Sequence, residues 1–144
     1  MASVAALYTP EVLALATVLA SVPLDGTLPL RGAARSAACG SSIELGLELD
    51  PKGQIGRVGI RAHSCAIGQA AATIFAGAAI GKDQAGIVAA IEDIEAWLAD
   101  RAAMPAWPGF APIVPARNFP GRHGAILLAW RAALEALSTT GIPG

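Results

Sequence analysis

The feature that most constrains the fold is a pair of alternating segments on either side of a tight turn. In residues 43–49 apolar side chains alternate with polar or small ones, which is the period of a half-buried β-strand. Residues 50–53 read Asp-Pro-Lys-Gly, a composition typical of a turn, and residues 55–62 alternate again. Ile55 is out of phase with its segment, which predicts a bulge or a later start. These patterns together predict an antiparallel β-hairpin.

Helical patterns lie on both sides of the hairpin. Residues 10–22 predict a helix with Thr9 as N-cap and Pro10 at its first position. Apolar residues recur at helical spacing over 66–81, 83–98 and 121–137. Residues 23–38 are interpreted as a loop, with at most a short edge strand, and the proline-rich residues 104–120 as a loop. The predicted class is α+β in the order α-β-β-α-α-α, with helices on one face of a small antiparallel sheet.

Length and composition limit the classes of protein that this chain can belong to. Its 144 residues predict one domain spanning 1–144, with frayed ends at 1–6 and 139–144. The hydrophobic fraction is 54%, but much of it is alanine, and no apolar run approaches the roughly 20 residues of a membrane helix. No basic residue precedes Arg31, and the net charge is −1 without any basic run. We therefore expect a cytoplasmic protein that binds neither membranes nor nucleic acid.

The two cysteines are placed symmetrically about the predicted turn. Cys39 lies 13 residues before Lys52, and Cys65 lies 13 residues after it. Because an antiparallel hairpin brings equidistant positions side by side, we expect the two thiols to meet at the open end of the sheet. Cys65 also begins a predicted helix, where free N–H groups favour a thiolate suited to soft metals or sulfur chemistry. The alternatives are two buried core thiols or a regulatory disulfide.

The two histidines are the other candidate metal ligands. His123 falls in the first turn of the last predicted helix, where the positive helix end favours a neutral imidazole that can bind metal. The alternative is an ordinary surface histidine. His63 falls on the solvent face of its strand, so we expect it to be exposed. No phosphate-binding loop, nucleophile elbow or zinc-protease motif is present.

Several short blocks across residues 6–138 resemble one family. They are the Tyr-containing residues 7–12, Ala38-Cys39-Gly40-Ser41 before a strand, His63-Ser64-Cys65-Ala66 before a helix of small residues, and Phe-Pro-Gly-Arg-His-Gly-Ala-Ile at 119–126. In these blocks the chain resembles the IscU/NifU/SufU-type iron–sulfur cluster scaffold proteins. Two positions depart from the family pattern, because Ser41 replaces the usual acidic residue and Gly124 replaces the usual third cysteine.

The resemblance implies a scaffold or carrier rather than an enzyme. Cys39, Cys65 and His123 would bind iron or a [2Fe–2S] cluster, and zinc is a further possible occupant. The fourth ligand is left open among Ser41, His63, water and a partner residue. The implied partners are a cysteine desulfurase, which supplies sulfide, and apo-proteins that accept the cluster. Two alternatives remain: a sulfur-transfer acceptor with a persulfide on Cys65 or Cys39, and a diverged binding module without a cluster. The oligomeric state is left open.

Overall fold

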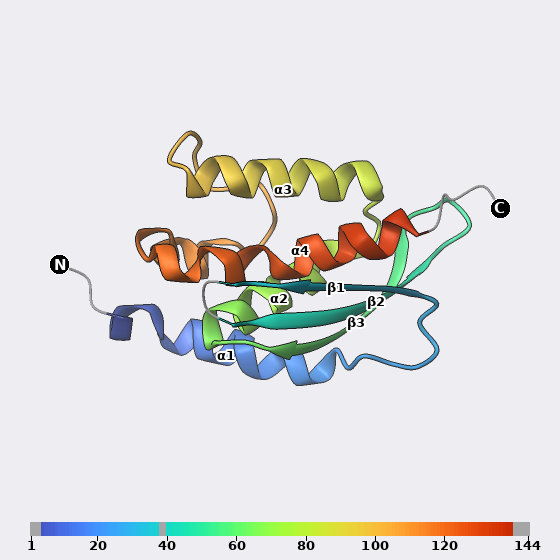
Figure 1. The fold of residues 1–144 in the computed structure, drawn as a ribbon, viewed down its shortest axis with the longest axis horizontal. Coiled ribbons are helices and arrows are strands. Elements are labelled where there is room, and N and C mark those ends of the chain that lie inside the picture. The colour runs from blue at the N-terminus through green and yellow to red at the C-terminus, as the bar shows by residue number, and fades with distance from the viewer. Residues whose placement is uncertain (1–3, 38–39, 140–144) are drawn as a thin grey trace.

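A three-stranded antiparallel sheet forms one layer of the molecule (Figure 1). The structure, a computed structural model, describes residues 4–37 and 40–139. The strands are β1 (Leu30–Arg35), β2 (Ser42–Leu49) and β3 (Ile55–His63), in the order β1-β2-β3. β2 and β3 form the predicted hairpin, and Asp50 Oδ1 closes its turn by accepting the N–H groups of Lys52 at 2.8 Å and Gln54 at 3.0 Å. The register shifts next to Leu49, which pairs with Ile55, so the predicted irregularity is confirmed.

The predicted order of elements lacked one strand. β1 pairs with β2 along its whole length, from Leu30 opposite Leu47 to Arg35 opposite Ser42. Its sequence, Leu-Arg-Gly-Ala-Ala-Arg, contains no β-branched or aromatic residue, so it carries little local preference for a strand. The observed order is therefore α-β-β-β-α-α-α, and the added strand depends on contacts with the rest of the fold.

Three of the α-helices begin where the sequence predicts them, and α4 begins two residues later than predicted. The α-helices are α1 (Pro10–Val18), α2 (Ala66–Ala79), α3 (Gln84–Leu98) and α4 (His123–Ser138). Thr9 caps α1 by accepting the N–H of Val12 at 3.2 Å, and Asp83 caps α3 by accepting the N–H of Gly86 at 2.9 Å. The prediction of a loop with little regular structure over 104–120 is wrong in part, because a 3-10 helix lies within it. The 3-10 helices are η1 (Val4–Leu7), η2 (Leu19–Ser21), η3 (Ala111–Asn118) and η4 (Pro120–Arg122).

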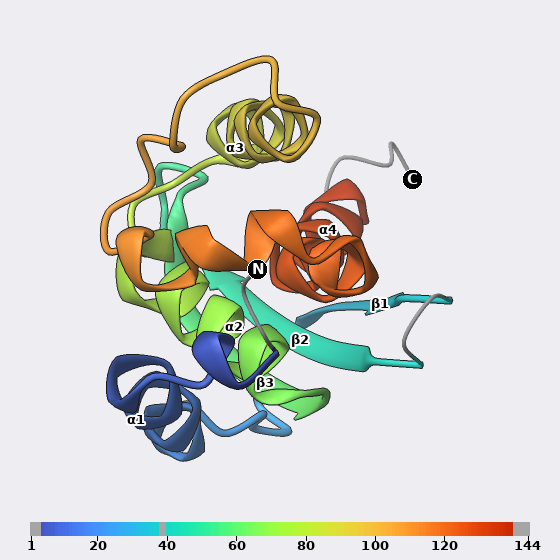
Figure 2. The same ribbon diagram turned by 90° about the vertical axis from the view of Figure 1, so that its left-hand side faces the viewer.

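All four α-helices lie on one face of the sheet, as predicted (Figure 2). α2 and α4 pack against the sheet and against each other, α1 packs on α2, and α3 packs on α4. Many of the buried positions of α2 and α4 are alanine, which lets these helices approach their neighbours closely. Within the described ranges, no helix has the length and apolar character that a membrane crossing requires.

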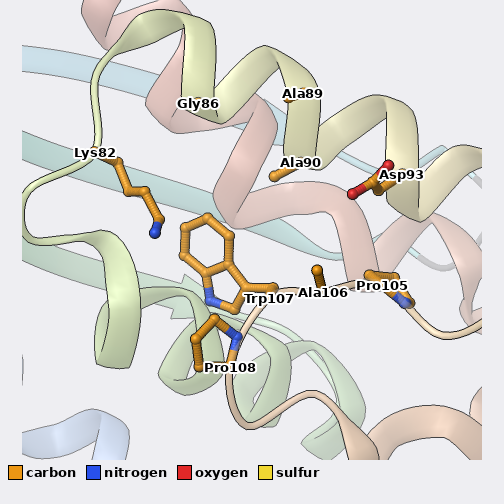
Figure 3. A pocket seen from close by; sticks show the side chains of 9 residues that line it. All are labelled: Lys82, Gly86, Ala89, Ala90, Asp93, Pro105, Ala106, Trp107 and Pro108. Atoms are coloured by element: carbon orange, nitrogen blue, oxygen red, sulfur yellow. The ribbon is translucent and has the colours of Figure 1, made fainter.

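The proline-rich segment before α4 packs on the core. The Trp107 side chain is 7% exposed and stacks on Phe75 with 5.6 Å between ring centroids. Its indole N–H donates a hydrogen bond to the Ile74 carbonyl at 2.8 Å, and Lys82 Nζ lies 5.3 Å from its ring centroid. Figure 3 shows this ring as one wall of a pocket of about 220 Å³ between α3 and residues 105–108. None of the predicted ligands lines this pocket.

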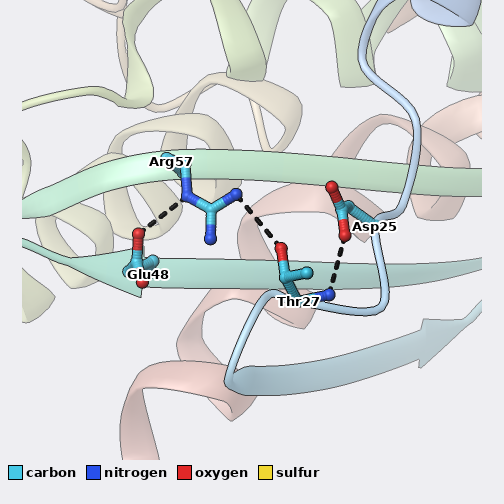
Figure 4. Close-up of polar contacts among 4 residues, drawn as sticks. All are labelled: Asp25, Thr27, Glu48 and Arg57. Carbon is cyan, nitrogen blue, oxygen red and sulfur yellow. Dashed lines mark hydrogen bonds and ion pairs between the residues drawn. The ribbon is translucent and has the colours of Figure 1, made fainter.

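Charged side chains occupy the opposite face of the sheet, as predicted. Arg57 Nε lies 2.7 Å from Glu48 Oε1, and Arg57 Nη1 donates to Thr27 Oγ1 at 3.3 Å (Figure 4). Asp25 Oδ1 accepts the N–H of Thr27 at 2.7 Å within the segment between α1 and β1, and the bond from Arg57 to Thr27 connects this segment to the sheet. The same segment approaches so closely that a Cβ at Gly59 would lie 2.5 Å from the Pro23 carbonyl oxygen.

The Glu48–Arg57 pair predicts a measurable titration effect. The hydrogen bond from Arg57 and its positive charge hold the pKa of the Glu48 carboxyl below its usual range. A lowered pKa stabilises the fold at pH values above the unfolded-state pKa, and this contribution is lost as the pH falls through the folded-state pKa. Its size is small because both groups are exposed.

We expect Arg57→Gln to raise the pKa of Glu48 toward its ordinary value, measured by NMR titration of the Glu48 side-chain carboxyl carbon. Arg61→Gln is the matched control, since Arg61 lies 3.6 Å from Glu44. It should leave the Glu48 titration unchanged. A Glu48 pKa that does not respond to Arg57→Gln would contradict the assigned cause.

Candidate functional site

Cys65 lies at the junction of β3 and α2, which is where the sequence predicts a helix start. It is the N-cap residue of α2, with an extended backbone, and its carbonyl accepts the N–H of Gln69 at 3.0 Å. Its side chain makes no capping hydrogen bond and is half-buried against the edge of the core. The thiol therefore has no structural role in starting the helix and remains partly accessible to a ligand.

The connection between β1 and β2 lies beside this junction. Ser36 N–H donates to the Ser41 carbonyl at 2.8 Å, and Gly40 N–H donates to the Ser36 carbonyl at 2.9 Å. Ser64 Oγ, next to Cys65, donates to Ser41 Oγ at 3.1 Å. Cys39 is outside the described residues, so its expected approach to Cys65 stays a prediction. What the structure does bring together are the neighbours of the two cysteines in sequence.

His123 begins α4 and is half-buried. Its Nε2 lies 2.6 Å from the carbonyl oxygen of Arg117. A carbonyl can only accept a hydrogen bond, so Nε2 carries a proton and Nδ1 is the nitrogen with which the ring can bind a metal. Metal-binding histidines commonly donate their other N–H to a backbone carbonyl in this way, which fixes the tautomer and the ring orientation. His63, in contrast, is exposed at the end of β3, as predicted.

The first turns of α2 and α4 pack against each other at this end of the sheet (Figure 1). A Cβ at Gly68 of α2 would lie 3.3 Å from Ala125 Cβ of α4. Ser36, the residue after β1, also lies against the start of α4, because a Cβ at Gly124 would overlap Ser36 Oγ and lie 3.0 Å from Ser36 Cβ. The segments that carry Cys65 and His123 and the Ser36 end of β1 are thus neighbours in space.

The donor types at this junction fit a soft or borderline metal ion. A cysteine sulfur and a neutral imidazole nitrogen are common ligands of zinc and iron. In the part of the chain that the structure describes, no three His, Cys, Asp or Glu side chains form a group that could hold a metal. Cys65 and His123 are two donors of the predicted three, and the third, Cys39, is outside the described residues.

Sequence reasoning named Ser41 as a possible ligand but did not single out Ser36 or Arg122. Arg122 Nη2 donates to Tyr8 Oη at 3.3 Å, which connects the N-terminal segment to the start of α4. Ser36 is 6% exposed and Ser41 is 4% exposed, so both are buried. No pattern along the chain distinguishes Ser36 from the surface serines, because its burial comes from α4, nearly ninety residues later.

Comparisons with known proteins place this architecture among solved structures. No family model matches the sequence, and no curated protein matches it. The structure of a nitrogen-fixing NifU-like protein (N-terminal) from Brucella abortus has a TM-score of 0.81 at 20% identity, over 94% of this chain and 96% of that chain. A Fervidobacterium islandicum protein assigned as an iron–sulfur cluster assembly scaffold for the SUF system has a TM-score of 0.82 at 20% identity, over 94% and 99%.

A third structure, of a hypothetical protein, has a TM-score of 0.70 at 24% identity and covers 88% of this chain and 96% of that chain. The molecule is thus an α+β protein with an antiparallel sheet covered on one face by helices. More specifically, it has the fold of NifU-like and SufU proteins over nearly its whole length.

Proposed function

We propose that this protein is an iron–sulfur cluster assembly scaffold or carrier that holds iron or a cluster as cargo. Cys39 and Cys65 bind the cargo, and His123 is the third donor. The observation that carries the proposal is the hydrogen bond from His123 Nε2 to the Arg117 carbonyl at 2.6 Å. It leaves Nδ1 as the ring nitrogen that is available to a ligand, on a helix that packs against α2, which the half-buried Cys65 begins. The two named structural neighbours, a NifU-like protein and a SUF-system scaffold, support the same role.

The chemistry of these donors suits a cargo that must be passed on. Thiolates are soft ligands for iron–sulfur clusters and also for zinc. Three donors leave one tetrahedral position open for Ser41, water or a group from a partner protein. In this role a cysteine desulfurase supplies sulfide and apo-proteins accept the cluster in the cytoplasm. The protein itself then binds and transfers, without turning over a substrate.

Anaerobic reconstitution tests this proposal directly. The purified protein is incubated with ferrous iron and sulfide, desalted, and its visible spectrum is recorded. We expect the sulfur-to-iron absorption of a bound cluster, together with matching amounts of protein-bound iron and sulfide. Wild-type protein that emerges without iron and without visible absorption would contradict the scaffold role.

The surroundings of Gly124 favour a second function, that of a sulfur-transfer acceptor. The first turn of α4 has no cysteine and so contributes no thiolate, and the side chain of Ser36 occupies the space beside Gly124. A sulfur-transfer acceptor needs only one reactive thiol. The Cys65 thiolate would attack the outer sulfur of a desulfurase persulfide, forming a new S–S bond and releasing the desulfurase cysteine as a thiolate. Mass spectrometry after incubation with a desulfurase and cysteine would show one added sulfur on the peptide that contains Cys65.

A further inference from the structure

We propose that Ser36 is a specificity-determining residue of the candidate site, because its side chain restricts the first turn of α4 to a single metal donor, His123. Ser36 directly follows β1, and Gly124 lies in the first turn of α4. The packing of Ser36 against Gly124 follows from the structure alone, and its consequence for metal binding rests on the proposed function.

Ser36 is held in place by its backbone. Its N–H donates to the Ser41 carbonyl at 2.8 Å, and its own carbonyl accepts the N–H of Gly40 at 2.9 Å. The residue is 6% exposed, so little free space surrounds its side chain. A group that competes for this space must therefore turn the Ser36 hydroxyl away and also push against Ser36 Cβ, which the backbone hydrogen bonds hold in place.

Gly124 faces this fixed serine. A Cβ at residue 124 would overlap Ser36 Oγ, and it would lie 3.0 Å from Ser36 Cβ, which is tighter than most Cβ contacts. Gly121, three residues earlier in the same segment, has no atom within 4 Å of its ideal Cβ position. The restriction is therefore local to residue 124 and arises from Ser36.

The packing of Ser36 against Gly124 limits the number of thiolates that the protein can offer to a metal. Residue 124 follows His123 and points at the connection between β1 and β2, so a cysteine there would add a thiolate beside the imidazole. Ser36 excludes it, and α4 supplies one nitrogen donor. A cluster that takes four protein ligands then cannot be held by this chain alone with Cys39, Cys65 and His123. A partner group, or a single ion with an open position, completes the set.

A double-mutant cycle tests the packing part. In the wild-type background we expect Gly124→Cys to lower the melting temperature of the metal-free protein by about 4 to 12 °C, as overpacking does. In the Ser36→Gly background the same substitution should change it by less than about 2 °C. Ser36→Ala, which removes Oγ but keeps Cβ, should give an intermediate result. Gly121→Cys is the matched control, expected within about 2 °C of wild type.

Cobalt(II) titration of the same variants tests the metal-binding part, because near-ultraviolet thiolate-to-cobalt absorption rises with the number of bound thiolates. We expect the Ser36→Gly/Gly124→Cys double variant to show about 1.5-fold the wild-type absorption, as for three thiolates against two. Equal absorption in wild type and double variant would overturn the proposal, as would a Gly124→Cys single variant that is fully stable. If wild-type protein binds no cobalt, the proposed function fails, and the melting cycle still decides the packing part.

Discussion

Replacing Gly32 by alanine is expected to lower the free energy of unfolding by about 3 kcal/mol or more, although the change adds a single methyl group. Gly32 lies in β1 opposite Leu45, on the side that α4 covers. A Cβ there would overlap the Ala132 carbonyl oxygen and lie 2.7 Å from the Ala136 nitrogen. Both atoms belong to the backbone of α4, so they cannot rotate away. The helix must move off the strand.

The direction of the change in the free energy of unfolding separates the contact with α4 from the intrinsic preference of a strand for alanine. Alanine is ordinarily favoured over glycine inside a strand by about 0.5 to 1 kcal/mol, so a loss of stability reports the contact with α4. Chemical denaturation of both proteins measures it. Gly26→Ala is the matched control, because nothing lies within 4 Å of its ideal Cβ, and it should stay within about 0.5 kcal/mol of wild type. A Gly32→Ala protein as stable as this control would refute the close packing of α4 on β1.

Replacing Cys65 by serine is expected to weaken metal binding at least about 100-fold while leaving the fold intact, since loss of a ligand exceeds the effect of losing its supporting contacts. The Cys65 side chain makes no capping bond to α2, and serine is a preferred N-cap residue. The variant should therefore melt at the wild-type temperature or slightly above it. Metal content after purification and titration against a competing chelator measure the affinity.

His63→Ala provides the control for this experiment. His63 lies two residues before Cys65 but is exposed at the end of β3, with Arg57 and Arg61 on the same face. We expect its removal to leave the metal content and affinity unchanged. A Cys65→Ser protein that keeps its full metal content would exclude Cys65 as a ligand, and a loss with His63→Ala would instead make His63 the fourth ligand.

Much of the fold could be predicted because its signals are local. The alternation of β2 and β3, the turn at Asp50 and the caps at Thr9 and Asp83 all act within a few residues of one another. β1 was undervalued because its Gly-Ala-Ala centre has little intrinsic strand preference. Its small residues make sense only beside α4, whose backbone closely approaches Gly32.

The candidate site, like the fold, could be predicted from the sequence only in part. The sequence by itself determined the donor types and the position of Cys65 at the start of a helix, since both follow from residue identity and local pattern. The contact between the Arg117 carbonyl and His123 spans only six residues, but no sequence pattern indicated it. Only the tertiary structure decided that Ser36 fills the space beside Gly124, because this contact joins segments nearly ninety residues apart. No local period encodes such a contact, because it depends on how α4 is placed against the sheet.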